Sequence, residues 1–99
     1  MSISVVIADP HPVMLEGLSR TLTAEPGFEV RACVCDGDAA WSALAQHEPD
    51  ILVLDLNLPG KSGLTLLQEL QASGLKTRPV VFTGAPIRDV VRAIDLGVR

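Results

Sequence analysis

The sequence predicts an α/β domain built on one doubly wound parallel sheet, and two observations support this prediction. Short apolar runs alternate along the chain with segments whose apolar residues recur at helical spacing, in the order βαβαβαβα. This alternation implies parallel strands joined by right-handed helical crossovers. Hydrophobic residues make up 47% of the chain and aromatic residues only 3%, which favours an aliphatic core over an aromatic-rich β-sandwich.

The length and charge of the chain limit its class. Its 99 residues suffice for one compact domain, residues 1–99. No apolar stretch approaches the length of a membrane span, and the N-terminus lacks the regions of a secretion signal, so we expect a soluble cytoplasmic protein that does not contact a membrane. With a net charge of −4, this segment is not expected to bind nucleic acid.

The first third of the chain predicts a strand, a helix and a second strand. Residues 3–8 form a buried strand that ends at Asp9. A helix follows, with Pro12 in its first turn, and it ends at Pro26-Gly27. Residues 28–34 alternate apolar and polar side chains, which is typical of a half-exposed edge strand.

Two helices are predicted on either side of the next strand. The first covers about residues 39–47, with Asp36 or Asp38 as its cap. The second runs from a cap at Ser62 through Ser73. Their expected inward positions are Ala40, Trp41, Leu44 and Ala45 in the first helix, and Leu64, Leu67 and Leu70 in the second.

The remaining elements are a central strand, a short fourth strand and a last helix. Residues 51–54 are four aliphatic residues without polar alternation, as in a strand buried on both faces, and Asp55 follows them. Residues 79–82 form the fourth strand. A final helix is expected over about 87–96, with Val90, Val91 and Ile94 inward.

Cys33 and Cys35 are the only cysteines in the chain. No second pair completes a zinc site, so they are expected to act as small buried hydrophobic residues.

Oxygen-bearing side chains follow three of the predicted strands: Asp9, Asp55 and Thr83. The carboxyl ends of parallel strands form the ligand-binding edge of an open sheet, so strand order 2-1-3-4 would bring the three together. Two carboxylates and a backbone carbonyl, such as that of Asn57, suit Mg²⁺, and a carboxylate can attack phosphorus to form an acyl phosphate. An isolated Asp more often closes a turn, so the surrounding residues must decide.

These residues resemble the receiver domains of two-component response regulators. The matching pieces are Asp9, the loop at residues 55–63 and the strand end at residues 80–85. The Asp-Pro-His-Pro segment at residues 9–12 is similar to receivers of LuxR-type transcriptional regulators, whose DNA-binding domain lies C-terminal to the receiver. The resemblance implies a flavodoxin-like sheet and a phosphoacceptor signalling domain rather than an enzyme.

The resemblance also implies a role for each site residue. Asp55 would accept a phosphoryl group from a sensor histidine kinase. Asp9, Asp55 and the Asn57 carbonyl would hold Mg²⁺, and Thr83 would contact the phosphoryl oxygens. Phosphorylation would then change dimerisation or DNA-binding output.

The sequence departs from the family at Pro10, where a second acidic residue is usual. Proline offers no carboxylate, so the affinity for Mg²⁺ is expected to fall. His11 could be considered as a substitute ligand, but imidazole suits Mg²⁺ poorly. We therefore expect His11 to lie exposed at the helix entry. Pro10 also supports an alternative function, a receiver-like interaction domain that works without phosphorylation.

The family's fifth strand, the lysine at its end and its fifth helix would all follow Arg99. We therefore expect a C-terminally incomplete receiver that pairs with a second copy as a homodimer or swapped dimer. DNA would be contacted only through a further C-terminal domain.

Overall fold

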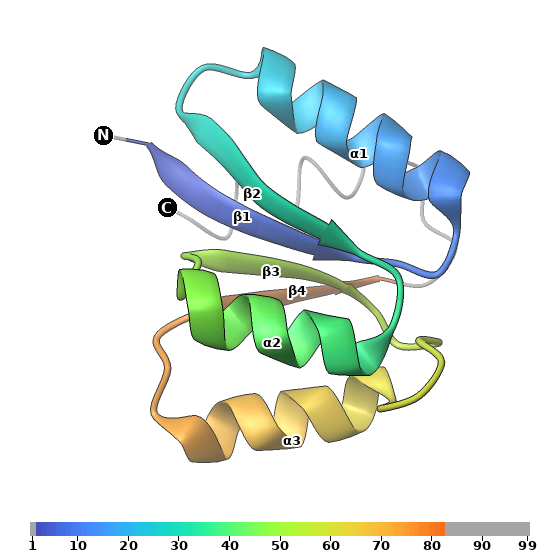
Figure 1. The fold of residues 1–99 in the computed structure, drawn as a ribbon. Coiled ribbons are helices and arrows are strands. Elements are labelled where there is room, and N and C mark those ends of the chain that lie inside the picture. The colour runs from blue at the N-terminus through green and yellow to red at the C-terminus, as the bar shows by residue number, and fades with distance from the viewer. Residues whose placement is uncertain (1, 83–99) are drawn as a thin grey trace.

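The computed structural model describes residues 2–82, in which helices and strands alternate along the chain (Figure 1). The elements are β1 (Ile3–Ala8), α1 (Pro12–Ala24), β2 (Phe28–Val34), α2 (Gly37–His47), β3 (Ile51–Asp55), α3 (Gly63–Ser73) and β4 (Arg78–Phe82). All strand pairs are parallel, and the sheet order is β2-β1-β3-β4. The predicted fold class and strand order are therefore confirmed.

The sheet separates two apolar cores. Helix α1 covers one face, and α2 and α3 cover the other (Figure 1). Central strand β3 contributes to both cores because its side chains alternate: Leu52 and Leu54 pack with α2 and α3, whereas Ile51 and Val53 pack with α1. Every residue of β3 is buried, as expected for an interior parallel strand.

Side-chain caps fix the starts of α2 and α3. Asp36 accepts a hydrogen bond from the backbone N–H of Ala39 at 2.7 Å, and Ser62 accepts one from Thr65 at 3.2 Å. Because Asp36 is the cap, α2 begins at Gly37, earlier than predicted. Helix α3 ends at Gly74, which has a φ of 81°, a left-handed conformation that glycine adopts without strain.

The predicted inward faces of α2 and α3 are partly wrong. Ala45 is exposed, and the side chain of Ala43 is buried instead. Leu64 is 61% exposed, whereas Leu66 is fully buried. Successive helical residues are rotated by about 100°, so two apolar residues two positions apart cannot both face the sheet.

The prediction that the two cysteines are buried is also wrong, since Cys33 and Cys35 are both exposed. Cys33 occupies an outward position in the alternating pattern of β2. Thr83 and the helix predicted over 87–96 lie outside the described residues. Within residues 2–82, no helix has the length and apolar character needed to cross a membrane.

Candidate functional site

Two aspartates leave the sheet side by side at the carboxyl ends of its central strands. The register of β1 and β3 pairs Ala8 with Leu54, so the next residues, Asp9 and Asp55, emerge at the same level. Both are buried, with Asp9 1% exposed and Asp55 3% exposed. The structure thus brings two of the predicted site residues together at the sheet edge where open α/β folds bind ligands.

The two carboxylates have different hydrogen-bond partners. Oδ1 of Asp55 accepts the backbone N–H of Asn57 at 2.9 Å. Oδ1 of Asp9 accepts the backbone N–H of His11 at 2.7 Å, while Oδ2 of Asp9 is buried and has no hydrogen-bond partner among the described residues. A buried carboxylate oxygen without a donor is costly, which favours a cation at this point.

His11 contacts both carboxylates, which its predicted position did not anticipate. Its side chain is 69% exposed at the entry to α1, as expected, but Nδ1 lies 2.9 Å from Asp9 Oδ1 and 3.9 Å from Asp55 Oδ2. The ligand atoms of Asp9, His11 and Asp55 all lie within 4.8 Å of one another. The sequence signal for His11 is its position directly before Pro12, two residues after a strand-ending aspartate.

The loop after Asp55 is held against the starts of two helices. The N–H of Gly37 donates to the Pro59 carbonyl at 3.1 Å, and the N–H of Gly63 donates to the Leu56 carbonyl at 3.2 Å. A Cβ on Gly37 would lie 1.7 Å from the carbonyl oxygen of Lys61, so only glycine permits this approach. The loop that carries Asn57 is therefore fixed on both sides.

Lys61 of this loop contacts both neighbouring helices. Its amine forms an ion pair with Glu69 of α3 and lies 5.8 Å from the centre of the Trp41 ring on α2. The distance suits a cation–π interaction. Lys61 therefore joins the loop to α2 and α3.

A divalent cation fits the donors at this edge. Asp9 and Asp55 supply two carboxylates, and the unpartnered oxygen of Asp9 needs a positive partner. The side chain of Asn57 is exposed, and the role of its carbonyl as a ligand stays a prediction. Thr83 lies beyond the described residues, so its predicted contact with a phosphoryl group also stays a prediction.

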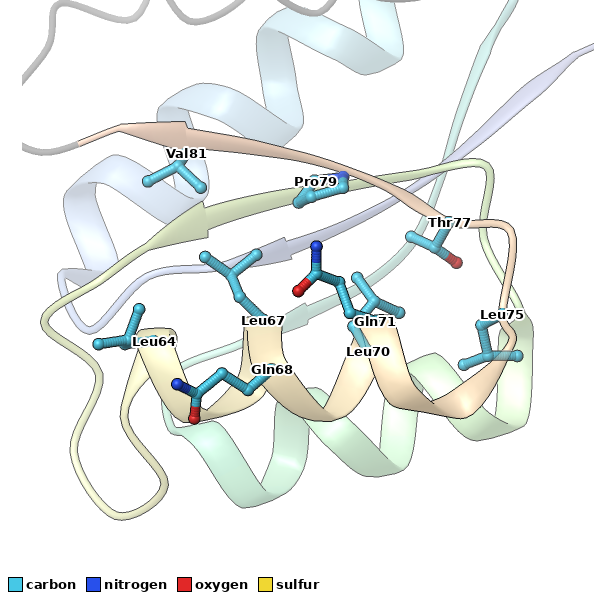
Figure 2. Close-up of a pocket in the computed structure, with 9 residues that line it drawn as sticks. All are labelled: Leu64, Leu67, Gln68, Leu70, Gln71, Leu75, Thr77, Pro79 and Val81. Atoms are coloured by element: carbon cyan, nitrogen blue, oxygen red, sulfur yellow. The ribbon is translucent and has the colours of Figure 1, made fainter.

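A separate apolar groove of about 600 Å³ lies between α3 and β4. Figure 2 shows Leu64 and Leu67 of α3 on one side and Pro79 and Val81 of β4 on the other. Asp9, His11 and Asp55 do not line this groove. The groove is therefore a second feature of the surface, apart from the candidate metal site.

Comparisons with known proteins identify the family to which the chain is similar. The family model described as "Response regulator receiver domain" matches residues 5–99. A nitrate/nitrite response regulator protein homolog of Haemophilus influenzae is 35% identical over 96 residues, which cover 96% of this chain and 46% of that protein. A protein-glutamate methylesterase/protein-glutamine glutaminase 2 of Anaeromyxobacter dehalogenans is 36% identical over 96 residues, or 28% of its length.

A solved structure is similar to this chain in its fold. The two-component response regulator of the LuxR family from Aurantimonas sp. SI85-9A1 superposes with a TM-score of 0.77 and 28% identity, over 98% of this chain and 70% of that one. The chain spans less than half the length of the two curated relatives described above. The similarity therefore concerns one module that these relatives carry within longer chains.

Proposed function

We propose, because the chain belongs to the family of response regulator receiver domains, that Asp55 is the phosphoacceptor of a two-component signalling protein. The observation that supports this proposal most directly is the burial of Asp55 beside Asp9 at the carboxyl edge of the sheet. Burial of two neighbouring carboxylates lowers the stability of the fold. Such clusters of buried titratable groups are typical of functional sites.

In the proposed reaction, a carboxylate oxygen of Asp55 attacks the phosphorus of a phosphohistidine on a sensor kinase. The new O–P bond gives an acyl phosphate, and the P–N bond breaks so that its electron pair returns to the kinase imidazole. The Asn57 N–H holds Oδ1 of Asp55 in place, which supports Oδ2 as the attacking atom. A cation at Asp9 and Asp55 would neutralise charge on the phosphoryl oxygens.

Two further residues complete the proposal. Thr83 would donate a hydrogen bond to the phosphoryl group, and the Asn57 carbonyl would join Asp9 and Asp55 around Mg²⁺. The position of Thr83 directly after β4, which pairs with β3 through Asp55 and Phe82, supports its role.

The proposal is tested by the intact mass of the protein after incubation with Mg²⁺ and a small phosphoryl donor. Wild type should gain one phosphoryl group, and Asp55→Asn should gain none. Asp50→Asn is the matched control, because Asp50 precedes the same strand at its other end and Asn keeps an oxygen that can accept from the Ser4 N–H. Equal labelling of wild type and Asp55→Asn would contradict the assignment.

Pro10 favours a second candidate, a receiver-like interaction domain that does not use phosphorylation. Proline cannot supply the carboxylate that the family usually has at this position, which weakens the case for a Mg²⁺-dependent reaction. The signal response of Asp55→Asn separates the two candidates. Loss of response supports the phosphoacceptor, and an unchanged response supports the interaction domain.

The proposed partners follow from the same function. We place the protein in the cytoplasm, with a sensor histidine kinase as phosphoryl donor and DNA bound through an output domain outside this chain. A homodimer or swapped dimer is the proposed assembly, supported by the exposure of Leu64 and Val81 at the groove between α3 and β4. Light scattering that finds only monomers at high concentration would contradict the dimer.

A further inference from the structure

Two free thiols lie exposed at the end of the edge strand β2. Cys33 and Cys35 are both exposed, and neither forms a disulfide. Neither side chain belongs to the two apolar cores, although the neighbouring Ala32 and Val34 pack against one of them. The packing role that is usual for a free cysteine therefore does not explain this pair.

The two thiols project from the same face of the sheet. Ala32 and Val34 of β2 face the core that contains α2 and α3. Cys33 alternates with them, so its side chain is directed to the opposite face, which α1 covers (Figure 1). Cys35 follows two residues later, and the backbone is still extended at Asp36, with a φ of −143° and a ψ of 164°. Cys33 and Cys35 therefore occupy successive positions on one face.

The spacing of this pair disfavours a disulfide. Residues two apart in an extended strand have Cα atoms about 6.6 Å apart, and side chains on one face keep their Cβ atoms at a similar separation. A disulfide requires Cβ atoms about 3.8 Å apart. Two thiolates on one ion place their sulfur atoms up to about 4.6 Å apart, because each metal–sulfur bond is about 2.3 Å long. The pair can therefore hold an ion without the backbone movement that a disulfide would require.

We propose that Cys33 and Cys35 form a two-coordinate site for a soft monovalent cation such as Cu⁺. Thiolate sulfur is a soft ligand that favours Cu⁺, and a two-coordinate ion needs no third protein ligand. Zn²⁺ would need four ligands, and the cluster of three candidate metal ligands within residues 2–82 contains neither cysteine. Binding releases both thiol protons, and water can solvate the resulting negative complex because both side chains are exposed.

This site is separate from the proposed phosphoacceptor, since it includes neither Asp9 nor Asp55. In the cytoplasm, where we place the protein, thiols stay reduced and remain available to a soft cation. Binding of Cu⁺ is measured without a phosphoryl donor. Failure of Asp55 to become labelled would therefore leave the thiol site standing, and failure of the thiol site would leave the phosphoacceptor standing.

The experiment is anaerobic titration of the full chain with Cu⁺ buffered by bicinchoninate, whose colour reports the Cu⁺ that the protein has not bound. Wild type should bind one Cu⁺ per chain. Cys33→Ser and Cys35→Ser should each lower the affinity by about 100-fold or more, because one thiolate cannot complete the site. Zn²⁺ should bind to wild type at least about 100-fold more weakly than Cu⁺.

His47→Asn is the matched control, because it removes an imidazole from the last turn of α2 and keeps both thiols. It should bind Cu⁺ as tightly as wild type does. Thermal unfolding should show that the two serine variants fold as wild type does, since both positions are exposed. X-ray absorption of the Cu⁺-loaded protein should show two sulfur ligands and no nitrogen ligand.

The proposal fails if wild type takes no Cu⁺ from bicinchoninate or if either serine variant keeps the wild-type affinity. One Zn²⁺ held between two chains would replace it with a four-thiolate site shared by two copies. Intact mass after mild oxidation tests the spacing argument. A monomer that loses two hydrogens would show that the pair closes an internal disulfide, which would also overturn the proposal.

Discussion

Asp9 has one carboxylate oxygen with two close donors and another with no partner among the described residues. The first oxygen fixes the turn into α1 through the N–H of His11. The second oxygen would be stabilised by a cation, because it has no donor within residues 2–82 and the neighbouring Asp55 is also a carboxylic acid. The properties of Asp9 therefore depend on the charges and hydrogen-bond donors around its carboxylate rather than on apolar packing.

The first prediction concerns Asp9→Asn. Without divalent cations, the variant should be more stable than wild type by about 1 kcal/mol or more, because one of two neighbouring buried carboxylates is neutralised. With a divalent cation at about 100 times its Kd, wild type should gain about 2.7 kcal/mol, and the variant should gain little. Urea unfolding in chelator and in excess Mg²⁺ measures both effects.

Asp38→Asn is the control, because Asp38 is exposed in the first turn of α2. It should keep the full response to the cation. An Asp9→Asn protein that Mg²⁺ stabilises as strongly as wild type would show that Asp9 does not hold the ion.

Asp9 and Asp55 could be predicted from the sequence, because each directly follows a buried strand and parallel strands end at one edge. The contact of His11 with both could not. It depends on the turn that the Asp9 carboxylate makes with the His11 N–H and on the orientation of one ring. Neither leaves a periodic pattern in the sequence.

At the scale of elements, caps and glycines set where the helices begin. Asp36 caps α2, Ser62 caps α3, and the glycine after each cap is buried in close contact with the loop that follows β3. These contacts hold the starts of both helices against the loop that follows Asp55. The starts of α2 and α3 and the position of the loop after Asp55 are therefore coupled.

The second prediction tests the cap of α2. Asp36→Ala should lower the free energy of unfolding by about 1 kcal/mol, because the N–H of Ala39 loses its acceptor. Asp36→Asn should stay close to wild type, since Asn is an equally good cap. Chemical denaturation of the three proteins compares them directly, and equal losses for Ala and Asn would mean that the negative charge, and not the hydrogen bond, matters.

The third prediction concerns Gly37→Ala. The added methyl would overlap the Lys61 carbonyl at 1.7 Å, so the loop or α2 must shift, with a loss of about 1–3 kcal/mol despite the better helix propensity of Ala. The same change should weaken cation binding, because the loop follows Asp55. Thermal unfolding and metal titration measure the two effects.

Gly74→Ala gives the contrast, because open space surrounds that position and only its φ of 81° opposes a side chain. It should lose about 1 kcal/mol and keep its cation affinity. A Gly37→Ala protein with wild-type cation affinity would show that the loop and the site are independent.

Most limits of the described strands and helices could be predicted because turn residues mark them, although α2 begins two residues earlier than predicted. The inward faces of α2 and α3 could not be fully predicted. Several apolar residues lie close together in each helix, so more than one apolar stripe is possible. The choice of Leu66 over Leu64 depends on how α3 packs against the sheet and α2. That packing is a tertiary property, which local spacing does not determine.

At the scale of the whole molecule, one sheet carries two cores that share β3. Leu18 of α1 and Leu66 of α3 are both fully buried, but on opposite faces. Neither core can lose its packing without exposing strands that the other core needs. The described part of the chain should therefore unfold as one unit.

The fourth prediction follows from this arrangement. Leu18→Ala and Leu66→Ala should each lower the free energy of unfolding by about 2–5 kcal/mol, because each leaves a cavity in a closed core. Leu64 lies on α3, as Leu66 does, but its side chain is 61% exposed. Leu64→Ala should therefore lower the free energy of unfolding by less than about 0.5 kcal/mol. Calorimetry should show a single transition with equal calorimetric and van't Hoff enthalpies, and two separate transitions would contradict the shared-sheet account.

The contact of Lys61 with Trp41 also gives the protein an internal optical reporter. Trp41 is the only tryptophan of the chain, and Lys61 belongs to the loop that begins directly after Asp55. Any ligand at Asp55 that displaces this loop will move the Lys61 amine relative to the indole ring. The wavelength and intensity of the tryptophan emission will then change. Occupancy of the site can thus be followed by intrinsic fluorescence in the unmodified protein, without an attached dye.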